Sequence, residues 1–508
     1  MSPLLIIVLI VVAVLAVVTV YDLTQRKHAI LRNFPVIGHF RYLLESIGPE
    51  LRQYIVTSNN EERPFSRDQR TWVYASAKKQ NNYFGFGTDN DLEHSSNYII
   101  IKHATFPWPE PEKKADPRLE LAGKIMGGAR GRRKAFRPPM LYVSAMSYGS
   151  LSGPAVQAIN RGNAIAGGLH NTGEGGVSRH HLQGGDLIWQ LGTGYFGARD
   201  EKGHFSLERL AERVETTPTI RAIEIKLSQG AKPGKGGVLP AAKITPEISQ
   251  IRGVPMGQDC LSPSYHTAFG SADELLDFVE RIADATGLPV GIKSAVGDTK
   301  FFVELADMME SGTRGVDYIA IDGGEGGTGA APLVFSDHVA LPFKIGFSRV
   351  YRIFAERGLQ DRVVFAGSGR LGFPEQSLLA FALGCDMVGV AREALLAIGC
   401  IQAQRCHTGH CPTGVATQNK WLVRGLDVTD KAARYANYAL TLDHDVMALA
   451  RACGVAHPGL ITLDHIEILD AGFGSRSARE VFLYEPEWSL PSPEEQRRLS
   501  TRMNAIGA

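Results

Sequence analysis

The feature that most constrains the fold is a regular alternation of short apolar runs and longer helical patterns, which begins near residue 140. The runs are rich in the β-branched and aromatic residues that favour strands, and helical patterns such as 271–286 and 374–384 lie between several of them. Because parallel strands are joined by crossover helices, this alternation indicates a parallel sheet covered by helices. Six runs are strand candidates: 140–146, 222–227, 288–294, 316–322, 362–368 and 386–391.

The length of this pattern selects one α/β architecture. At about 280 residues it fits a (β/α)8 TIM barrel with insertions better than an open sheet. The missing strands are expected near residues 169–176 and in the irregular middle of the pattern. We expect the barrel to cover residues 140–425, followed over 426–508 by a long helix and a mobile end.

Polar, glycine-rich segments follow four of the predicted strands, at 147–153, 228–237, 323–332 and 367–372. Active sites of barrel enzymes lie at the carboxyl ends of the strands, and the loops after the last two strands commonly bind phosphate. Four such loops favour a phosphorylated cofactor over simple tight turns. ATP and NAD motifs are not supported, because Lys235 is followed by Gly236 rather than Ser or Thr, and no suitably placed acidic residue follows 323–329.

An apolar run at residues 3–21 carries no charge and is long enough, as a helix, to cross the hydrocarbon core of a bilayer. A cleaved signal peptide is the alternative, but no Lys or Arg precedes the run and no clear cleavage site follows. The next residues predict a single-pass membrane anchor with the N-terminus outside and the catalytic domain in the cytoplasm. They include Arg26, Lys27, His28 and Arg32.

Residues 22–139 are expected to form a juxtamembrane and linker region. Its basic run is either solvated or attracted to anionic lipid, and it comprises Arg130, Arg132, Arg133, Lys134 and Arg137. Over the whole chain, 54 basic and 53 acidic residues nearly cancel, so the charge balance gives no argument for a nucleic-acid partner.

Three of the six cysteines lie close together in the sequence: Cys400, Cys406 and Cys411. In a reducing cytoplasm such a group is typical of metal binding or catalysis rather than of disulfides. Zinc and an iron–sulfur cluster are both compatible with the residue types, because His407 and His410 fall within the same segment. The remaining cysteines are interpreted as small buried hydrophobic residues.

Several motifs in matching order resemble the FMN-binding synthase domain of the glutamate synthase family. They are SAMSYGSLSG (144–153), NTGEGG (171–176), IKLSQGAKPGKGG (225–237), DGGEGGTGAAP (322–332) and the cysteine segment. The length and termini are similar to those of stand-alone members with an N-terminal membrane segment. The resemblance implies a flavoprotein oxidoreductase acting on CH–NH2 donors, with FMN and a [3Fe-4S] cluster held by Cys400, Cys406 and Cys411.

The same resemblance implies which residues hold FMN. The backbone of Ala145, Met146 and Ser147 is expected to line the flavin ring. Lys293 is expected to stabilise the charge that a reduced flavin carries, with an ordinary ion pair at a strand end as the alternative. The phosphate is expected at Gly367, Ser368, Gly369, Gly389, Val390, Ala391 and Arg392.

Glutamate synthase reduces 2-iminoglutarate, formed from 2-oxoglutarate and ammonia, with electrons that reach FMN through the cluster. By resemblance, Lys232 and Arg252 bind the substrate and Glu174 lies on the ammonia path. Val238 stands where the large glutamate synthases have glutamine, so a related oxo acid or another amine remains open.

The partners follow from what the chain is expected to lack. Without an amidotransferase domain it should use free ammonia or a separate glutaminase subunit. Without a nicotinamide site it should take electrons from a donor such as a ferredoxin or a reductase subunit. The alternative function is a membrane-docked electron-transfer or scaffold subunit that keeps FMN and the cluster without turnover.

Overall fold

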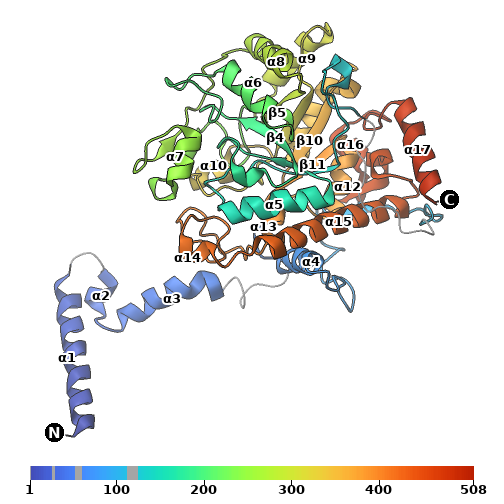
Figure 1. The fold of residues 1–508 in the computed structure, drawn as a ribbon. Coiled ribbons are helices and arrows are strands. Elements are labelled where there is room, and N and C mark those ends of the chain that lie inside the picture. The colour runs from blue at the N-terminus through green and yellow to red at the C-terminus, as the bar shows by residue number, and fades with distance from the viewer. Residues whose placement is uncertain (1, 26–28, 52–59, 111–123, 508) are drawn as a thin grey trace. The chain divides into compact units, whose positions relative to one another are not determined.

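The computed structural model describes residues 2–25, 29–51, 60–110 and 124–507. The chain divides into two compact units, Met1–Arg70 and Thr71–Ala508. The larger unit carries a central sheet surrounded by helices (Figure 1).

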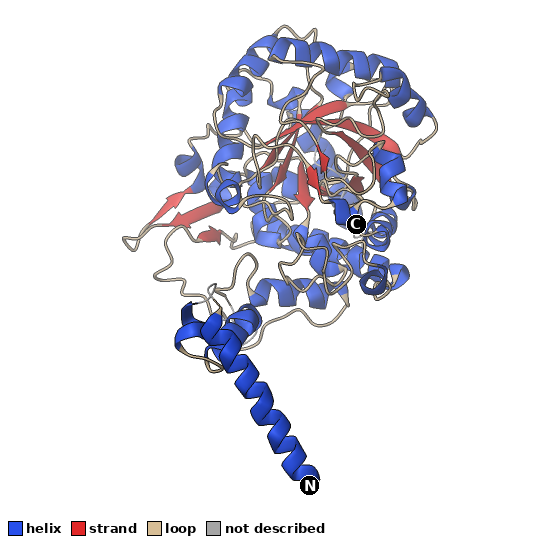
Figure 2. Cartoon of the chain, turned by 90° about the vertical axis from the view of Figure 1, so that its left-hand side faces the viewer, coloured by secondary structure: helices blue, strands red, loops and turns tan. Residues whose placement is uncertain are grey.

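Eight parallel strands of the larger unit close into a barrel, and their order around it follows the sequence. The last strand closes on the first, with Val388 paired to Leu141 and Val390 to Val143. Figure 2 shows these strands at the centre, ringed by helices. They are β2 (Leu141–Val143), β3 (Leu169–Asn171), β4 (Asp186–Leu191), β5 (Ile220–Lys226), β8 (Val290–Ser294), β9 (Tyr318–Asp322), β10 (Val364–Ser368) and β11 (Met387–Val390).

The prediction of a (β/α)8 barrel is therefore confirmed. Five of the six predicted strands contain a barrel strand, and the sixth, 222–227, overlaps β5, which begins two residues earlier at Ile220. β3 lies where a seventh strand was expected. β4 is the strand that the sequence left unassigned in its irregular middle. Strands such as β8 are buried along their whole length, as expected where helices cover a parallel sheet.

The helices that cover the barrel begin and end at residues suited to those positions. Ser152 and Ser271 accept hydrogen bonds from the backbone N–H of Ala155 and Glu274 at the starts of α5 and α8. Both helices end at a glycine with positive φ. The helices between and after the strands are α5 (Gly153–Ala166), α6 (Leu207–Glu215), α7 (Pro246–Arg252), α8 (Ala272–Thr286), α9 (Lys300–Glu310), α10 (Leu333–His338), α11 (Phe343–Ala355), α12 (Pro374–Ala382), α13 (Arg392–Ala397), α14 (Lys420–Val423) and α15 (Val428–Ala452).

Two small antiparallel sheets accompany the barrel. One joins β1 (Ile99–Ile101), β12 (Ile466–Leu469) and β13 (Ser475–Ser477). The other pairs β6 (Val238–Leu239) with β7 (Cys260–Leu261), in the insertion between β5 and β8 that also contains α7.

The C-terminal end is more ordered than the sequence suggested. Tyr484 follows the short helix α16 (Ala478–Phe482). Its ring stacks on that of Tyr351 in α11, with the ring centroids 5.5 Å apart. The expected mobile end forms α17 (Pro493–Gly507) instead, in which Leu499 is buried and Glu495 pairs with Arg137 at 3.2 Å.

The smaller unit contains α1 (Pro3–Thr24), α2 (Ala29–Asn33) and α3 (Gly38–Leu51), followed by the start of α4 (Arg67–Ala77). Among the described residues, α1 is the one helix long and apolar enough to cross a membrane, with a mean hydropathy of 3.3. Of the basic residues expected beside the membrane, Arg26, Lys27 and His28 lie outside the described residues.

Candidate active site

The carboxyl ends of the eight barrel strands open at one mouth, and the residues selected from the sequence come from its loops and strand ends. Arg252 is the exception, because it ends α7 in the insertion between β5 and β8. The others follow or end their strands: Ala145, Met146 and Ser147 after β2, Glu174 after β3, Lys232 after β5, Lys293 in β8, Gly367 and Ser368 in β10 with Gly369 after it, and Gly389 and Val390 in β11 with Ala391 and Arg392 after it.

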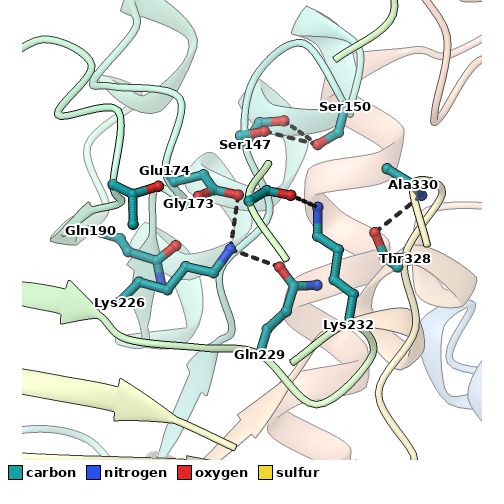
Figure 3. A network of polar contacts seen from close by, with 12 residues as sticks. Ser147, Ser150, Gly173, Glu174, Gln190, Lys226, Gln229, Lys232, Thr328 and Ala330 are labelled. Atoms are coloured by element: carbon teal, nitrogen blue, oxygen red, sulfur yellow. Dashed lines mark hydrogen bonds and ion pairs between the residues drawn. The ribbon is translucent and has the colours of Figure 1, made fainter. Parts of the chain in front are cut away.

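Glu174 lies beside Lys226, the last residue of β5, and near Lys232 in the loop after β5 (Figure 3). Its Oε1 accepts a hydrogen bond of 2.8 Å from Nζ of Lys226, which also donates to Gln229 Oε1 at 2.7 Å. Burial raises the pKa of Glu174, but the charge and hydrogen bond of Lys226, helped by Lys232 and Arg252, outweigh it and leave the pKa lowered. Glu174 is therefore a carboxylate at neutral pH.

Lys232 lies in the same loop and is almost fully buried, with 4% of its surface exposed. Its Nζ donates to the backbone carbonyl of Gly236 at 3.1 Å. Burial lowers its pKa, and the nearby Lys226 adds to this, while Glu174 opposes it. An anion at this position would relieve the repulsion between the two ammonium groups.

Arg252 reaches the β2 loop from the end of α7. One guanidinium nitrogen donates to the carbonyl of Tyr148 at 3.2 Å and to Ser147 Oγ at 3.4 Å. Only 6% of the residue is exposed, yet its Nε has no hydrogen-bond partner among the described residues. A buried guanidinium with an unused donor suits a carboxylate ligand.

The loop after β3 passes close to both neighbours because it is rich in glycine. A Cβ added at Gly173 would lie 2.6 Å from Ser147 N, and one at Gly175 would lie 2.8 Å from a guanidinium nitrogen of Arg252. Any larger residue would push these segments apart. The glycines of NTGEGG therefore bring Glu174, Ser147 and Arg252 to one place.

Tyr148 fixes α7 at both ends. Its carbonyl accepts from Arg252, the last residue of α7, and its hydroxyl donates to Glu247 at the first turn at 2.8 Å. Glu247 also pairs with Arg179 at 2.9 Å, and its pKa stays lowered although burial raises it. The position of Arg252 thus depends on a contact with the β2 loop.

Lys293 points its ammonium into a buried network at the barrel mouth. Nζ donates to Ser144 Oγ at 3.1 Å and lies 3.6 Å from Asp322 Oδ2. Asp322 in turn accepts from Ser368 Oγ at 2.6 Å and from the backbone N–H of Gly230 at 2.9 Å. The ends of β8, β9 and β10 are thereby linked through one carboxylate.

A second buried carboxylate lies inside the barrel. Glu224 of β5 accepts from Asn171 and Gln190, each at 2.7 Å. Burial raises its pKa, and Lys293 is the main opposing charge. Glu224, Gln190 and Asp322 were not predicted as site residues, although each is a polar residue directly beside apolar residues of a barrel strand, which is a usable signal.

The two loops expected to bind phosphate lie side by side. Ser368 of β10 pairs with Gly389 of β11, and Glu393 ties the loops together by accepting from the backbone N–H of Gly372 and Ala391, each at 3.3 Å. Arg370 adopts a φ of +59°, a strained value for a residue with a side chain. Arg392 donates to the carbonyl of Glu325, and burial lowers its pKa.

The cysteine segment packs against the same mouth. The backbone N–H of Ser152, after β2, donates to the carbonyl of Val415 at 2.9 Å, and Gln418 donates to the carbonyl of Leu151 at 2.8 Å. On the other side, a Cβ added at Gly329 in the β9 loop would lie 3.1 Å from the backbone of Cys406. Residues 406–418 therefore run between the loops that follow β2 and β9.

Two of the three cysteines act on each other electrostatically beside a buried lysine. Lys243 donates to the carbonyls of Cys406 at 2.8 Å and Ala416 at 3.1 Å. Burial raises the pKa of Cys406, as does Cys411, while Lys243 opposes both. Burial also raises the pKa of Cys411, but bonds from the backbone N–H groups of Ala416, Thr413 and Val415 and from the Thr413 hydroxyl leave it lowered.

The third cysteine has different neighbours: the carbonyl of Cys400 accepts from Tyr74 Oη at 2.7 Å, and its Sγ accepts from the backbone N–H of Gln402. Within the described ranges, no three or more His, Cys, Asp or Glu side chains are grouped so as to bind a metal ion. The three cysteines, alone or with His407 and His410, therefore do not form such a group in the described part of the chain.

Comparison with known proteins identifies the family. The model described as the conserved region in glutamate synthase matches residues 135–456. The glutamate synthase large subunit-like protein YerD of Bacillus subtilis is 37% identical over 489 residues, 90% of this chain and 92% of that protein. The archaeal glutamate synthase (NADPH) of Methanocaldococcus jannaschii is 36% identical over 323 residues, 62% of this chain and 59% of that protein.

Solved structures show only a distant likeness. A flavocytochrome b2 variant with sulfite bound is 14% identical, with a TM-score of 0.44, over 92% of this chain and 95% of that chain. This likeness carries no argument about function.

The barrel and the sequence relatives together define an oxidoreductase that acts on CH–NH2 donors. The chain belongs to the glutamate synthase family.

Proposed function

We propose that the protein is an FMN-dependent enzyme that converts an oxo dicarboxylate and ammonia into an amino acid, with 2-oxoglutarate as the first substrate to test. In this reaction the oxo acid and ammonia lose water to form an imine, and two electrons and two protons then reduce the imine. The observation that carries the proposal is the grouping of Lys226, Lys232 and Arg252 around Glu174 at the barrel mouth.

The charges at the mouth suit a substrate with two carboxylates. Three cations face one carboxylate there, so an incoming dianion would balance the charge. Arg252 is suited to bind one carboxylate through its planar guanidinium, and Lys232 is suited to bind the other through its ammonium group. Glu174, held ionised by Lys226, is suited to attract ammonium by its charge or to hold ammonia near the oxo carbon.

The residues at the mouth are compatible with FMN. The half-buried backbone of Ala145, Met146 and Ser147 is proposed to line the ring, and Lys293 to face its N1 and O2. The paired loops 367–369 and 389–392, with the buried guanidinium of Arg392, are proposed to bind the phosphate. When bound, FMN supplies the hydride that reduces the imine.

We also propose a [3Fe-4S] cluster, which the donor set fits in part. Backbone N–H groups directed at Cys411 lower the pKa of its thiol and favour a thiolate there. Lys243 acts in the same direction on Cys406, although burial and Cys411 leave the pKa of Cys406 raised. Cys400 would have to turn towards them, and no step of the reaction is derived through the cluster. The electron donor is proposed to be a ferredoxin or a reductase subunit, and ammonia to come free or from a separate glutaminase subunit.

The anchoring of this enzyme to a membrane is part of the proposal and rests on α1, whose apolar side chains are exposed along its length. The barrel would then lie on the cytoplasmic side.

The test is made on the purified full-length protein. Flavin, iron and labile sulfide are measured first, and then glutamate formation from 2-oxoglutarate and ammonium with a reduced ferredoxin as donor. Absence of flavin would overturn the proposal. Flavin without glutamate formation would reject 2-oxoglutarate as the substrate. If Lys232→Ala then also left the cellular role of the protein intact, an electron-transfer or scaffold role would be favoured over an enzyme.

A further inference from the structure

The helix α3 carries an apolar face that the described parts of the chain leave exposed. Five side chains form it, with exposed fractions of 39 to 61%: Phe40, Leu43, Leu44, Ile47 and Leu51. At 3.6 residues per turn their positions fall within a sector of about 100°. Arg41, Tyr42, Glu45, Ser46 and Glu50 lie outside this sector, with Arg41 and Glu45 paired at 3.8 Å.

A buried joint fixes the start of α3 to the end of α1. Asp22, two residues before the last residue of α1, is fully buried. Its carboxylate accepts the backbone N–H of Val36 at 2.8 Å and bonds the ring of His39 at 2.9 Å. A Cβ added at Gly38 would lie 3.0 Å from Leu31 of α2, so the three helices are tightly packed at this corner.

The joint determines where α3 would lie if α1 crosses a bilayer. At 1.5 Å per residue α1 is about 33 Å long, close to the thickness of the hydrocarbon core, so Asp22 would lie at the membrane surface. In Figures 1 and 2, α3 leads away from that end of α1 and does not fold back along it. A helix with one apolar sector, starting at the surface of a bilayer, is suited to lie in the interface.

We propose that α3 lies in the membrane interface, with Phe40, Leu43, Leu44, Ile47 and Leu51 inserted among the lipids at the boundary of headgroups and acyl chains. This inference rests on the proposed membrane anchor. The polar side of α3 has acidic as well as basic residues, with Arg41 opposed by Glu45 and Glu50. Insertion therefore depends on apolar burial and does not require anionic lipid.

The test uses the full-length protein reconstituted into vesicles of phosphatidylcholine alone. A nitroxide is attached through an introduced ketone side chain, so that the native cysteines are untouched. Residues 44 and 47 report the apolar face, and residues 45 and 46 are the matched controls on the polar side. Oxygen, which concentrates in lipid, and a nickel chelate, which stays in water, are used as relaxation probes for each label.

We expect the oxygen-to-nickel accessibility ratio to be several-fold higher at 44 and 47 than at 45 and 46. High nickel accessibility at all four positions would overturn the inference. Shielding of 44 and 47 from both reagents would also overturn it, because it would mean that a second copy or another protein covers the face.

A label at residue 12, within α1, separates failure of the inference from failure of the anchor. If residue 12 is accessible to oxygen but 44 and 47 are accessible to nickel, the interfacial position of α3 is wrong and the anchor stands. If residue 12 is accessible to nickel while 44 and 47 behave as expected, the span is wrong and the contact of α3 with lipid stands.

Discussion

Glu174 Oε1 and Lys226 Nζ form a 2.8 Å ion pair that joins the loop after β3 to the end of β5. The side chains are 19% and 11% exposed, so the pair is only weakly screened by water. Gln229 accepts from the same ammonium at 2.7 Å and fixes its direction. The pair therefore sets both the position and the charge of the carboxylate proposed to handle ammonia.

Replacing Lys226 by Met should affect activity through Glu174. Burial raises the pKa of Glu174, and Lys226 is the largest opposing effect, so its removal should raise that pKa. The carboxylate would then take up a proton as pH falls, at a higher pH than in the wild type. We expect kcat/KM for ammonia to fall roughly 100-fold, as misplaced catalytic groups commonly cause, and the acidic limb of its pH profile to shift upwards.

Lys235→Met is the matched control. Lys235 lies in the loop after β5, which Lys226 precedes, but its side chain is exposed. Its Nζ lies over the ring of Phe335, 5.1 Å from the ring centroid. Its pH profile should stay that of the wild type. A Lys226→Met profile that superimposes on the wild-type curve would show that Glu174 does not titrate in the reaction.

Gly175→Ala should disturb the guanidinium of Arg252 without removing any functional group. The new Cβ would lie 2.8 Å from a nitrogen of Arg252 and 3.0 Å from Ser147 Cβ, so one of them must move. Because Arg252 is proposed to bind a substrate carboxylate, we expect KM for the oxo acid to rise about tenfold, equivalent to ~1.4 kcal/mol. Steady-state kinetics at saturating ammonium measures this change.

Gly297→Ala provides the comparison, since a Cβ there would meet no atom within 4 Å and its φ is not positive. It should leave KM unchanged. Equal kinetics of the two variants would place the substrate away from Arg252.

Lys293→Gln should lower the reduction potential of the flavin. Lys293 is 4% exposed, and its ammonium lies beside Ser144 and Asp322. A positive charge near a flavin stabilises the reduced form, so its loss should favour the oxidised form. We expect a drop of some tens of mV in a redox titration, where 30 mV corresponds to ~1.4 kcal/mol for a two-electron couple.

The exposed Lys300→Gln at the start of α9 removes the same charge from a side chain that is 91% exposed, where water screens it, and should leave the potential unchanged. If both variants keep the wild-type potential, Lys293 is an ordinary ion pair at a strand end.

The barrel was predictable because β-rich runs recur along the chain and several of them are followed by a glycine-rich loop, as in 316–332. The strand β4 was not predicted, because Gly184, Gly185, Gly192 and Gly194 flank it and make this part of the sequence resemble a loop. The C-terminal helix α17 was missed because few apolar side chains, such as Leu499, attach it to the barrel.

Contacts between distant parts of the chain could not be read from the sequence. Arg132, interpreted as solvated or lipid-facing, instead pairs with Glu280 at 2.5 Å and Asp317 at 3.0 Å, which lie 148 and 185 positions further on. Lys243 lies 163 positions before Cys406, to whose carbonyl it donates. Local patterns predict the strands and loops, but the partners of charged side chains depend on how the barrel closes.

Cys411→Ala should remove the proposed cluster while leaving the proposed flavin. Backbone N–H groups around Cys411 lower the pKa of its thiol against the effect of burial, which suits a thiolate ligand of iron. We expect iron and labile sulfide to fall to background with FMN retained. Cys453→Ala is the matched control, because Cys453 is also buried but follows α15, outside the cysteine segment. Full iron content in Cys411→Ala, or an equal loss of iron in both variants, would show that Cys411 is not a ligand. Zinc in place of iron in the wild-type protein would reject the iron–sulfur cluster itself.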